Sequence, residues 1–298
     1  MQPKYTIIIV GAGKVGTAIG TLLHQKDHRI VAAAAAHQAS LETTGRYLPA
    51  AYLSVDLREI ARYGAKADII LLTTQDDQIQ PTCETLAAYG TFTPRHTVMH
   101  MSGASTLDVL ASACVAGAGV ASIHPIQSFA SAELAIEKIP GSYFGVTADD
   151  GARDVALAVV RDLGGVPIDI QDEDKAMYHA AACITSNYLV TLLHMAEKVY
   201  NAAGLRADIA LDAMMTLISG TLSNIEKVGT IEALTGPIAR GDVTIIKQHL
   251  QSLRRLDANI ERAYRVLGLQ TVDVAVKKGT LSAENAAELI AVLEDRSC

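Results

Sequence analysis

The sequence predicts a mostly parallel, doubly wound α/β domain followed by an all-α domain. Short apolar segments typical of buried strands alternate with helix-like segments in the first half of the chain. A glycine-rich turn follows the first of these strands, and strand signals stop after Ile170, where helical periodicity takes over. We therefore expect an α/β domain over residues 1–171 and a helical domain over residues 172–298.

Each element of the α/β domain has its own local signal. The expected strands are short and apolar, and read YTIIIV, HRIVAAAAA, ADIILLTT, TVMHMS, VASIHP, YFGVTA and GVPIDI. Helices are expected at KVGTAIGTLLHQ, LREIARYG and DGARDVALAVVRDLGG. Because parallel strands need a crossover connection, usually a helix, this alternation indicates a parallel sheet. The segment that begins at Asp172 is long enough for a central helix of the second domain, with Gly204 as its C-cap.

Composition and charge exclude several classes of protein. Of the 298 residues, 50% are hydrophobic and 19% are charged, which fits a globular chain with a large core. A net charge of -7 and a pI near 5.7 give no basic surface for nucleic acid. No signal-type segment precedes the first strand and no run of about 18 apolar residues occurs, so we expect no membrane segment.

The four cysteines point to a reducing compartment. Cys83, Cys114, Cys183 and Cys298 form no C-x-x-C pair and lie in unrelated contexts. Neither a disulfide framework nor a metal site is therefore expected. Reduced thiols fit a cytoplasmic protein best.

The stretch IIIVGAGKVGTAIG carries the glycine pattern of the Rossmann dinucleotide-binding fold. Its glycines allow a tight turn, the approach of the backbone to a pyrophosphate, and close packing of helix on strand. The helix N-terminus adds unpaired N–H groups and a favourable field for phosphate. A vestigial loop without ligand is the alternative. The residues expected to contact the dinucleotide are Gly11, Ala12, Gly13, Lys14, Val15 and Gly16.

The end of the second strand favours NADP over NAD. An Asp or Glu there would bind the ribose 2′-hydroxyl of NAD, but the strand runs IVAAAAAHQAS without a carboxylate. His37, Gln38 and Ser40 can instead donate hydrogen bonds to a 2′-phosphate. The alternative is that His37 is an ordinary exposed loop residue.

Polar residues also follow the strand ADIILLTT. Thr73, Thr74 and Gln75 are expected in the crevice at the carboxyl ends of the strands, where a dinucleotide crosses an open parallel sheet. Asp76 and Asp77 are expected to cap the next helix.

Two further strands end in a polar residue beside Gly or Pro. Ser102-Gly103 and His124-Pro125 should reach the same sheet edge as the glycine loop, with Gly103 near the cofactor. A residue before proline is restricted to an extended conformation, which fixes the direction of His124. The alternatives are a turn serine and a loop histidine. His100, inside its strand, is expected to be a satisfied core residue.

A polar stripe follows the expected helix DKAMYHAAACITSNYLV. At about 100° per residue, Lys175, His179, Ser186 and Asn187 share one sector of the helix. The stripe is either the solvated side of a surface helix or the wall of the cofactor crevice.

The combination of these motifs resembles a known family. VGAGKVGTAIG, HMSGAS, SIHPIQSF, KAMYHAAACITSNYLV and ALTGPIARGD are similar to Rossmann-like oxidoreductases that carry a DUF2520 helical domain. The wider group contains β-hydroxyacid dehydrogenases, pyrroline-carboxylate reductases, ketopantoate reductases and prephenate dehydrogenases. The resemblance implies dependence on NAD(P) and a homodimer formed through the helical domain.

The resemblance also implies roles for single residues. His124 is similar to the His-Pro histidine of prephenate dehydrogenases, which acts on the substrate hydroxyl, and Ser102 to a serine near the nicotinamide. The β-hydroxyacid branch has a lysine and an asparagine one helical turn apart. Here His179 follows Lys175 after one turn and Asn187 comes later, so His179 and Lys175 compete as proton donor.

The segment ALTGPIARGD supplies candidate substrate contacts. Thr235 and Arg240 lie in it, and Asn224 is on a neighbouring expected helix. Arg240 could bind a carboxylate bidentately, or it could pair with Asp242 and fix the loop.

These observations predict an oxidoreductase that moves a hydride between a nicotinamide and a small hydroxy acid, keto acid or imine. His124, His179 or Lys175 would transfer the proton, and Asn187 and Ser102 would orient the reacting group. The alternative is an NADP-binding sensor or scaffold without catalysis.

Overall fold

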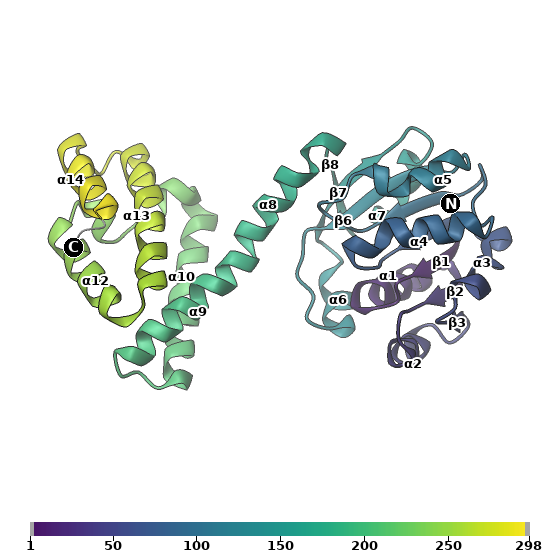
Figure 1. Cartoon of the computed structure of the whole chain (residues 1–298), viewed down its shortest axis with the longest axis horizontal. Coiled ribbons are helices and arrows are strands. Elements are labelled where there is room, and N and C mark those ends of the chain that lie inside the picture. The colour runs from purple at the N-terminus through teal and green to yellow at the C-terminus, as the bar shows by residue number, and fades with distance from the viewer. Residues whose placement is uncertain (1–2, 296–298) are drawn as a thin grey trace. The chain divides into compact units, whose positions relative to one another are not determined.

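The computed structural model of the chain describes residues 3–295 (Figure 1). The chain divides into two compact units, Met1–Ser186 and Asn187–Cys298. The first is an α/β unit and the second is helical, in the order that the sequence predicts.

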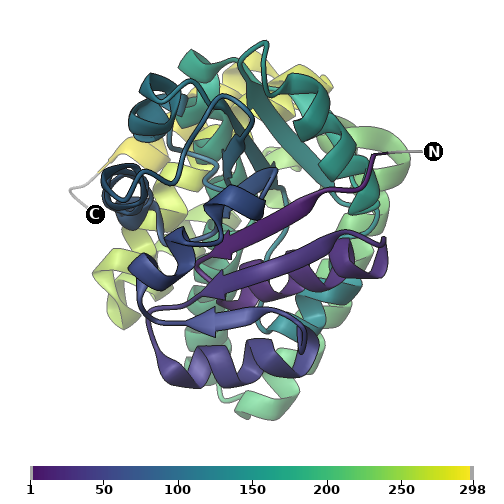
Figure 2. The same ribbon diagram turned by 90° about the vertical axis from the view of Figure 1, so that its right-hand side faces the viewer.

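The described part of the α/β unit contains one eight-stranded sheet in the order β3-β2-β1-β4-β5-β6-β7-β8. Every neighbouring pair is parallel except β6 and β7, so the prediction of a mostly parallel sheet is confirmed. In Figure 2, β1, β2 and β3 lie side by side. The strands are β1 (Thr6–Val10), β2 (Arg29–Ala34), β3 (Tyr52–Ser54), β4 (Ile69–Leu72), β5 (Thr97–His100), β6 (Gly119–Pro125), β7 (Tyr143–Ala148) and β8 (Val166–Asp169).

Helices cover both faces of this sheet, each over its own apolar cluster. α1, α6 and α7 pack on one face, and α3, α4 and α5 pack on the other. The helices are α1 (Lys14–Gln25), α2 (Gln38–Tyr47), α3 (Leu57–Ala61), α4 (Asp76–Ala88), α5 (Ala111–Val115), α6 (Ala132–Lys138), α7 (Arg153–Asp162) and α8 (Lys175–Thr185). Three short 3-10 helices, η1 (Gly64–Lys66), η2 (Leu107–Leu110) and η3 (Asp172–Asp174), complete the described connections.

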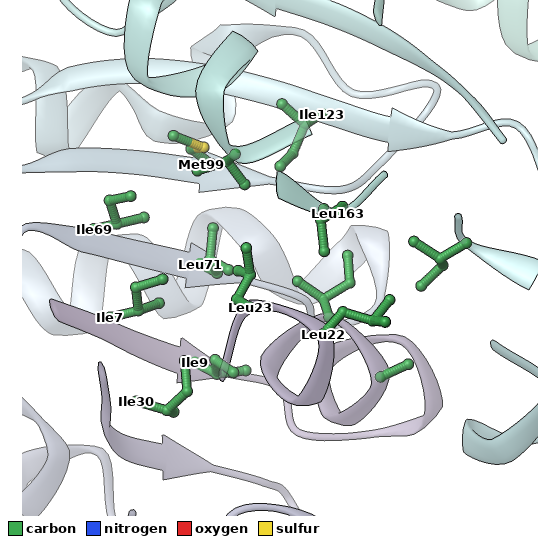
Figure 3. Close-up of a cluster of buried hydrophobic side chains, with 14 of the residues drawn as sticks. Ile7, Ile9, Leu22, Leu23, Ile30, Ile69, Leu71, Met99, Ile123 and Leu163 are labelled. Carbon is green, nitrogen blue, oxygen red and sulfur yellow. The ribbon is translucent and has the colours of Figure 1, made fainter. Parts of the chain in front are cut away.

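The period-two alternation of the strands builds both clusters. Ile7 and Ile9 of β1 and Leu71 of β4 point toward Leu22 and Leu23 of α1 (Figure 3). The intervening strand residues belong to the opposite cluster. Burial of each such aliphatic side chain contributes about 1.5–3 kcal/mol. The sheet is therefore a rigid support for the residues at its carboxyl edge.

The helical unit has a core in its second half. Buried side chains of α11, α12, α13 and α14 form one apolar cluster. In α9 no described residue is buried, and in α10 only Ala210 and Met214 are. The helices are α9 (Asn187–Ala202), α10 (Ala207–Glu232), α11 (Pro237–Arg240), α12 (Val243–Leu256), α13 (Ala258–Lys278) and α14 (Ala283–Glu294). None of the helices in residues 3–295 meets the length and hydropathy that crossing a membrane requires.

The boundary between the units differs from the expected one. The sequence predicts a single helix through DKAMYHAAACITSNYLV and a division after residue 171, but the backbone breaks at Ser186 (φ -109, ψ -65) and the units divide there. Lys175 is buried, and its hydrogen bonds to Ser122 of β6 and to the carbonyl of Ser102 after β5 tie α8 to the α/β unit.

Candidate functional site

The glycine loop has the geometry that close approach requires. Gly11 has φ +104, and a side chain there would overlap the backbone of Thr73 and Thr74. A Cβ at Gly16 would overlap the Thr73 hydroxyl and the carbonyl of Gly11. At Gly13 the nearest protein atom would be 3.9 Å away, so the missing side chain leaves open space at the N-terminus of α1. That open space suits a phosphate group.

Beside this loop lies a cavity of about 420 Å³ at the carboxyl ends of β1, β2 and β4. No acidic residue lines the cavity within the described chain. Its wall contains seven of the residues expected to bind the cofactor, Gly11, Gly13, His37, Ser40, Thr73, Thr74 and Gln75. Ala12, within the loop, is buried, while Lys14, Val15, Gly16 and Gly103 are outside this wall.

His37 and Ser40 lie at the start of α2. His37 is the N-cap residue of that helix, yet its side chain makes no capping hydrogen bond and is exposed. Ser40 stands in the first turn and also lines the cavity. Both side chains therefore adjoin a helix N-terminus, which favours an anion.

The two aspartates after Gln75 do not occupy the capping position. Gln75 is the N-cap of α4, and Asp76 and Asp77 are in its first turn. There their negative charges interact favourably with the positive end of the helix dipole. The carboxylate of Asp76 accepts a hydrogen bond of 2.7 Å from Ser102 Oγ. Asp76 thus joins the cavity edge to the end of β5, a contact that the sequence did not predict.

Ser102 is occupied by protein contacts. Its hydroxyl donates to Asp76 and accepts from the backbone N–H groups of Ala104 and Ser105 at 3.2 and 3.0 Å. The side chain is buried, so its hydrogen is already committed. This arrangement favours a role in shaping the turn over direct contact with a reacting group.

Lys175 anchors α8 to the sheet. Its Nζ donates to Ser122 Oγ at 2.6 Å and to the carbonyl of Ser102 at 3.2 Å, and only 2% of the residue is exposed. Burial lowers the pKa of Lys175 to about 8, although Asp172 and Asp76 act in the opposite direction. Ser122 was not among the residues expected at the site. Its position two residues before His124, on the same side of β6, was the available signal.

His100 is in the core, as expected, but only one ring nitrogen is paired. Nδ1 accepts from the N–H of Ser102 at 3.1 Å, and Nε2 has no hydrogen-bond partner within the described residues. Burial lowers the pKa of His100 to about 3, and Lys175 adds to that shift. The ring is therefore neutral at pH 7.

His124 and His179 lie together at the end of β6. Their ring centroids are 5.9 Å apart. A Cβ at Gly103 would lie 2.7 Å from His179 and 2.8 Å from His124, so this glycine allows both rings to approach the turn after β5. Burial, reinforced by the charges of His179 and Lys175, lowers the pKa of His124 to about 4.

Tyr178 completes the cluster. Its hydroxyl lies 2.8 Å from Nδ1 of His124, and its ring meets the imidazole edge-on. It follows Lys175 by about one turn and so shares its face of the helix, which is the signal in the sequence that points to it. The cluster of the α/β unit therefore comprises Ser122, His124, Lys175, Tyr178 and His179.

The other expected site residues belong to the helical unit. Asn187 is exposed at the start of α9, and Asn224 and Thr235 are exposed as well. Arg240 forms an ion pair with Asp242, with Nη2 and Oδ2 2.9 Å apart, so the interpretation of a self-paired loop fits its geometry. Within residues 3–295, no group of three or more His, Cys, Asp or Glu side chains could hold a metal ion.

Two family models match the chain. A Rossmann-like domain matches residues 1–125, and a domain of unknown function, DUF2520, matches residues 142–271. His124 lies in the first match and Tyr178 in the second, so both matched regions contribute to the cluster. No curated protein matches the sequence.

Solved structures share the fold over nearly the whole chain. A candidate NADP oxidoreductase from Bacteroides fragilis is 21% identical, with a TM-score of 0.72, over 91% of this chain and 98% of that one. A protein from Thermotoga maritima is also 21% identical, with a TM-score of 0.69, over 92% and 99%. Pyrroline carboxylate reductase from Plasmodium falciparum, solved with NADP bound, is 14% identical with a TM-score of 0.60, over 97% and 98%.

At these identities the likeness establishes the fold and not the reaction. The matched regions agree with the motifs on which the resemblance rests. The chain therefore combines an amino-terminal Rossmann-like domain with a DUF2520 domain.

Proposed function

We propose that the protein is an NADP-dependent oxidoreductase that transfers a hydride between the nicotinamide and a small hydroxy acid, keto acid or imine. The observation that carries this proposal is the alignment of two features along one sheet edge. The cavity at the glycine loop adjoins β1, β2 and β4, and the histidine cluster follows at β5 and β6. The likeness to oxidoreductases of the same fold adds support.

The cavity fits NADP better than NAD. A 2′-phosphate near His37 and Ser40 would meet hydrogen-bond donors and the N-terminus of α2. No carboxylate lines the described wall to bind a free ribose hydroxyl or to repel the phosphate. The open space at Gly13 would admit the pyrophosphate.

The side chains of the cluster would have different roles around the reacting carbon. The bound nicotinamide supplies or accepts the hydride. His124 contacts the reacting oxygen or nitrogen and is the first candidate for acid-base work, with His179 as the second. Lys175 is too buried for direct contact in the described structure, so we assign it to holding α8 against β5 and β6.

We propose that the helical unit forms a homodimer and contributes to substrate binding. α9 and α10 expose large apolar side chains, among them Val190, Leu217 and Leu222, which a second copy would cover. Asn187, Asn224, Thr235 and Arg240 stay candidates for substrate contact. The three described cysteines, all free, are compatible with a cytoplasmic protein.

The direct test is reduction of 2-oxo acids and cyclic imines with NADPH, followed by loss of nicotinamide absorbance. Wild-type protein should reduce at least one class, and His124→Gln should lower kcat by about 100-fold or more because general acid-base catalysis is lost. His24→Gln, at an exposed position in the last turn of α1 and outside the cavity, is the matched control and should retain activity. NADPH binding without turnover of any substrate would favour a sensor or scaffold.

A further inference from the structure

Tyr178 makes a polar contact that has no role in the proposed mechanism. Its hydroxyl is 2.8 Å from Nδ1 of His124, and the two rings are nearly perpendicular, at 89° with centroids 5.5 Å apart. Tyr178 stands on α8, which Lys175 anchors to the sheet. The contact therefore has a rigid support on both sides.

Gly145 makes room for the phenol. It lies opposite His124 in the antiparallel pairing of β6 and β7. A Cβ at this position would lie 2.6 Å from the Tyr178 oxygen and 2.8 Å from Cζ. Any side chain at position 145 would push the phenol away from the imidazole, so the glycine and the tyrosine act as a pair.

The protonation of the phenol bears on the direction of this hydrogen bond. Burial raises the pKa of Tyr178 to about 12, so the phenol keeps its proton at neutral pH. The phenol therefore has one hydrogen to donate, and Nδ1 of His124, 2.8 Å from its oxygen, is in position to accept it.

His124 is neutral at pH 7, because burial lowers its pKa to about 4. A neutral imidazole that accepts a hydrogen bond at Nδ1 carries its proton on Nε2. Within residues 3–295, Nε2 has no hydrogen-bond partner. Nε2 of His124 therefore has an N–H group that can donate a hydrogen bond to a ligand.

We propose that Tyr178 is a positioning residue that holds His124 in the Nε2–H tautomer, so that the site takes a carbonyl substrate such as a 2-oxo acid. A carbonyl oxygen accepts a hydrogen bond from Nε2–H, whereas a protonated imine presents an N–H donor to the same atom. The substrate assignment rests on the proposed function, in which His124 contacts the reacting group. The tautomer assignment concerns the protein alone.

The tautomer can be measured without any ligand. In full-length protein labelled with ¹⁵N-histidine, the chemical shifts of Nδ1 and Nε2 at neutral pH report which nitrogen is protonated, and His124→Gln assigns the resonances. We expect a protonated Nε2 and an unprotonated Nδ1 in the wild type. Tyr178→Phe should lose this preference, and Gly145→Ala should lose it too because the phenol is displaced.

Tyr143→Phe is the matched control, since Tyr143 is an exposed tyrosine on β7. It should leave the His124 resonances unchanged. A wild-type protein with the proton on Nδ1, or a folded Tyr178→Phe variant with an unchanged tautomer, would overturn the assignment.

A pH titration of the same samples adds a second readout. A hydrogen bond to the neutral form of a histidine disfavours its charged form, so Tyr178→Phe should raise the pKa of His124. The other groups that act on His124 are Lys175 and His179 of α8 and Asp76 of α4, and all are retained in the variant. An unchanged or lowered pKa would count against the proposal.

Turnover then separates the substrate assignment from the tautomer. With NADPH, a 2-oxo acid should be reduced and a cyclic imine should not, and Tyr178→Phe should lower kcat by up to about 100-fold with little change in KM. Reduction of cyclic imines alone, or of neither class, would contradict the substrate assignment. Absence of NADPH binding would instead contradict the proposed function. It would not affect the tautomer assignment, which is measured without a ligand.

Discussion

The two units of the chain differ in how far their apolar side chains are buried. In the α/β unit, Ile7, Ile9 and Leu71 are completely buried between sheet and helices. In the helical unit, Val190 and Leu217 are 67% and 64% exposed, and the apolar core is confined to α11 through α14. The first unit thus supports its site on a tightly packed core, whereas α9 and α10 have apolar surface available for a partner.

The largest effect on stability is expected when a side chain of the α/β core is truncated. Leu71→Ala should lower the free energy of unfolding by about 2–5 kcal/mol, because it removes packing and leaves a cavity. Leu134→Ala, at a partly exposed site on α6, should cost less than about 1 kcal/mol. Urea unfolding measures both. Equal losses would mean that the sheet core is not the main source of stability.

The apolar surface of α10 is tested by a charge. Leu217→Glu should weaken the proposed dimer by about 100-fold or more, because the change occurs twice in a symmetric interface and each buried leucine contributes about 1.5–3 kcal/mol. Thr216→Glu introduces the same charge on a neighbouring exposed residue. Sedimentation at several concentrations gives the dissociation constant. A wild-type monomer would contradict the proposed partner.

A smaller effect is expected at the cavity. His37→Asp should lower the affinity for NADPH by about tenfold or more, because the carboxylate repels the 2′-phosphate, and should leave or improve the affinity for NADH. His194→Asp places the same charge on the exposed surface of α9. Fluorescence titration with both cofactors measures the ratio. An unchanged preference would remove His37 from the cofactor site.

The last prediction concerns the anchor of α8 and is read as a dependence of stability on pH. Lys175 loses its proton near pH 8 in the folded protein but near 10.5 in the unfolded chain. Between these values the unfolded state binds more protons, so the stability conferred by Lys175 rises with pH in that window. Relative to Lys175→Met, the wild type should therefore gain stability from pH 8 to 10.5. A constant difference would show that the lysine is not desolvated.

Much of the α/β fold was predictable because local signals agree with the final packing. The helix KVGTAIGTLLHQ forms over the predicted residues, as does the strand YFGVTA. The short edge strand β3 was missed, since three residues give no periodicity. The break at Ser186 was missed because the helical segments on its two sides follow each other without a glycine or proline between them.

The site was predictable only in part. The strand-end rule placed Ser102 and His124 at one sheet edge, but which side chains they bond to depends on tertiary packing. The hydrogen bonds between Asp76 and Ser102 and between Tyr178 and His124 join residues that are far apart in the sequence. Gly145 could not be singled out, because its absent side chain matters only once Tyr178 is placed beside it.

Cofactor binding tests the central claim most directly. NADPH and NADH are titrated into wild-type protein, into Gly13→Val, and into Gly151→Val, a change at a glycine of the same unit outside the cavity. We expect tight NADPH binding that Gly13→Val abolishes and Gly151→Val retains. Binding of neither cofactor to the wild type, or NADPH binding unaffected by Gly13→Val, would contradict that claim.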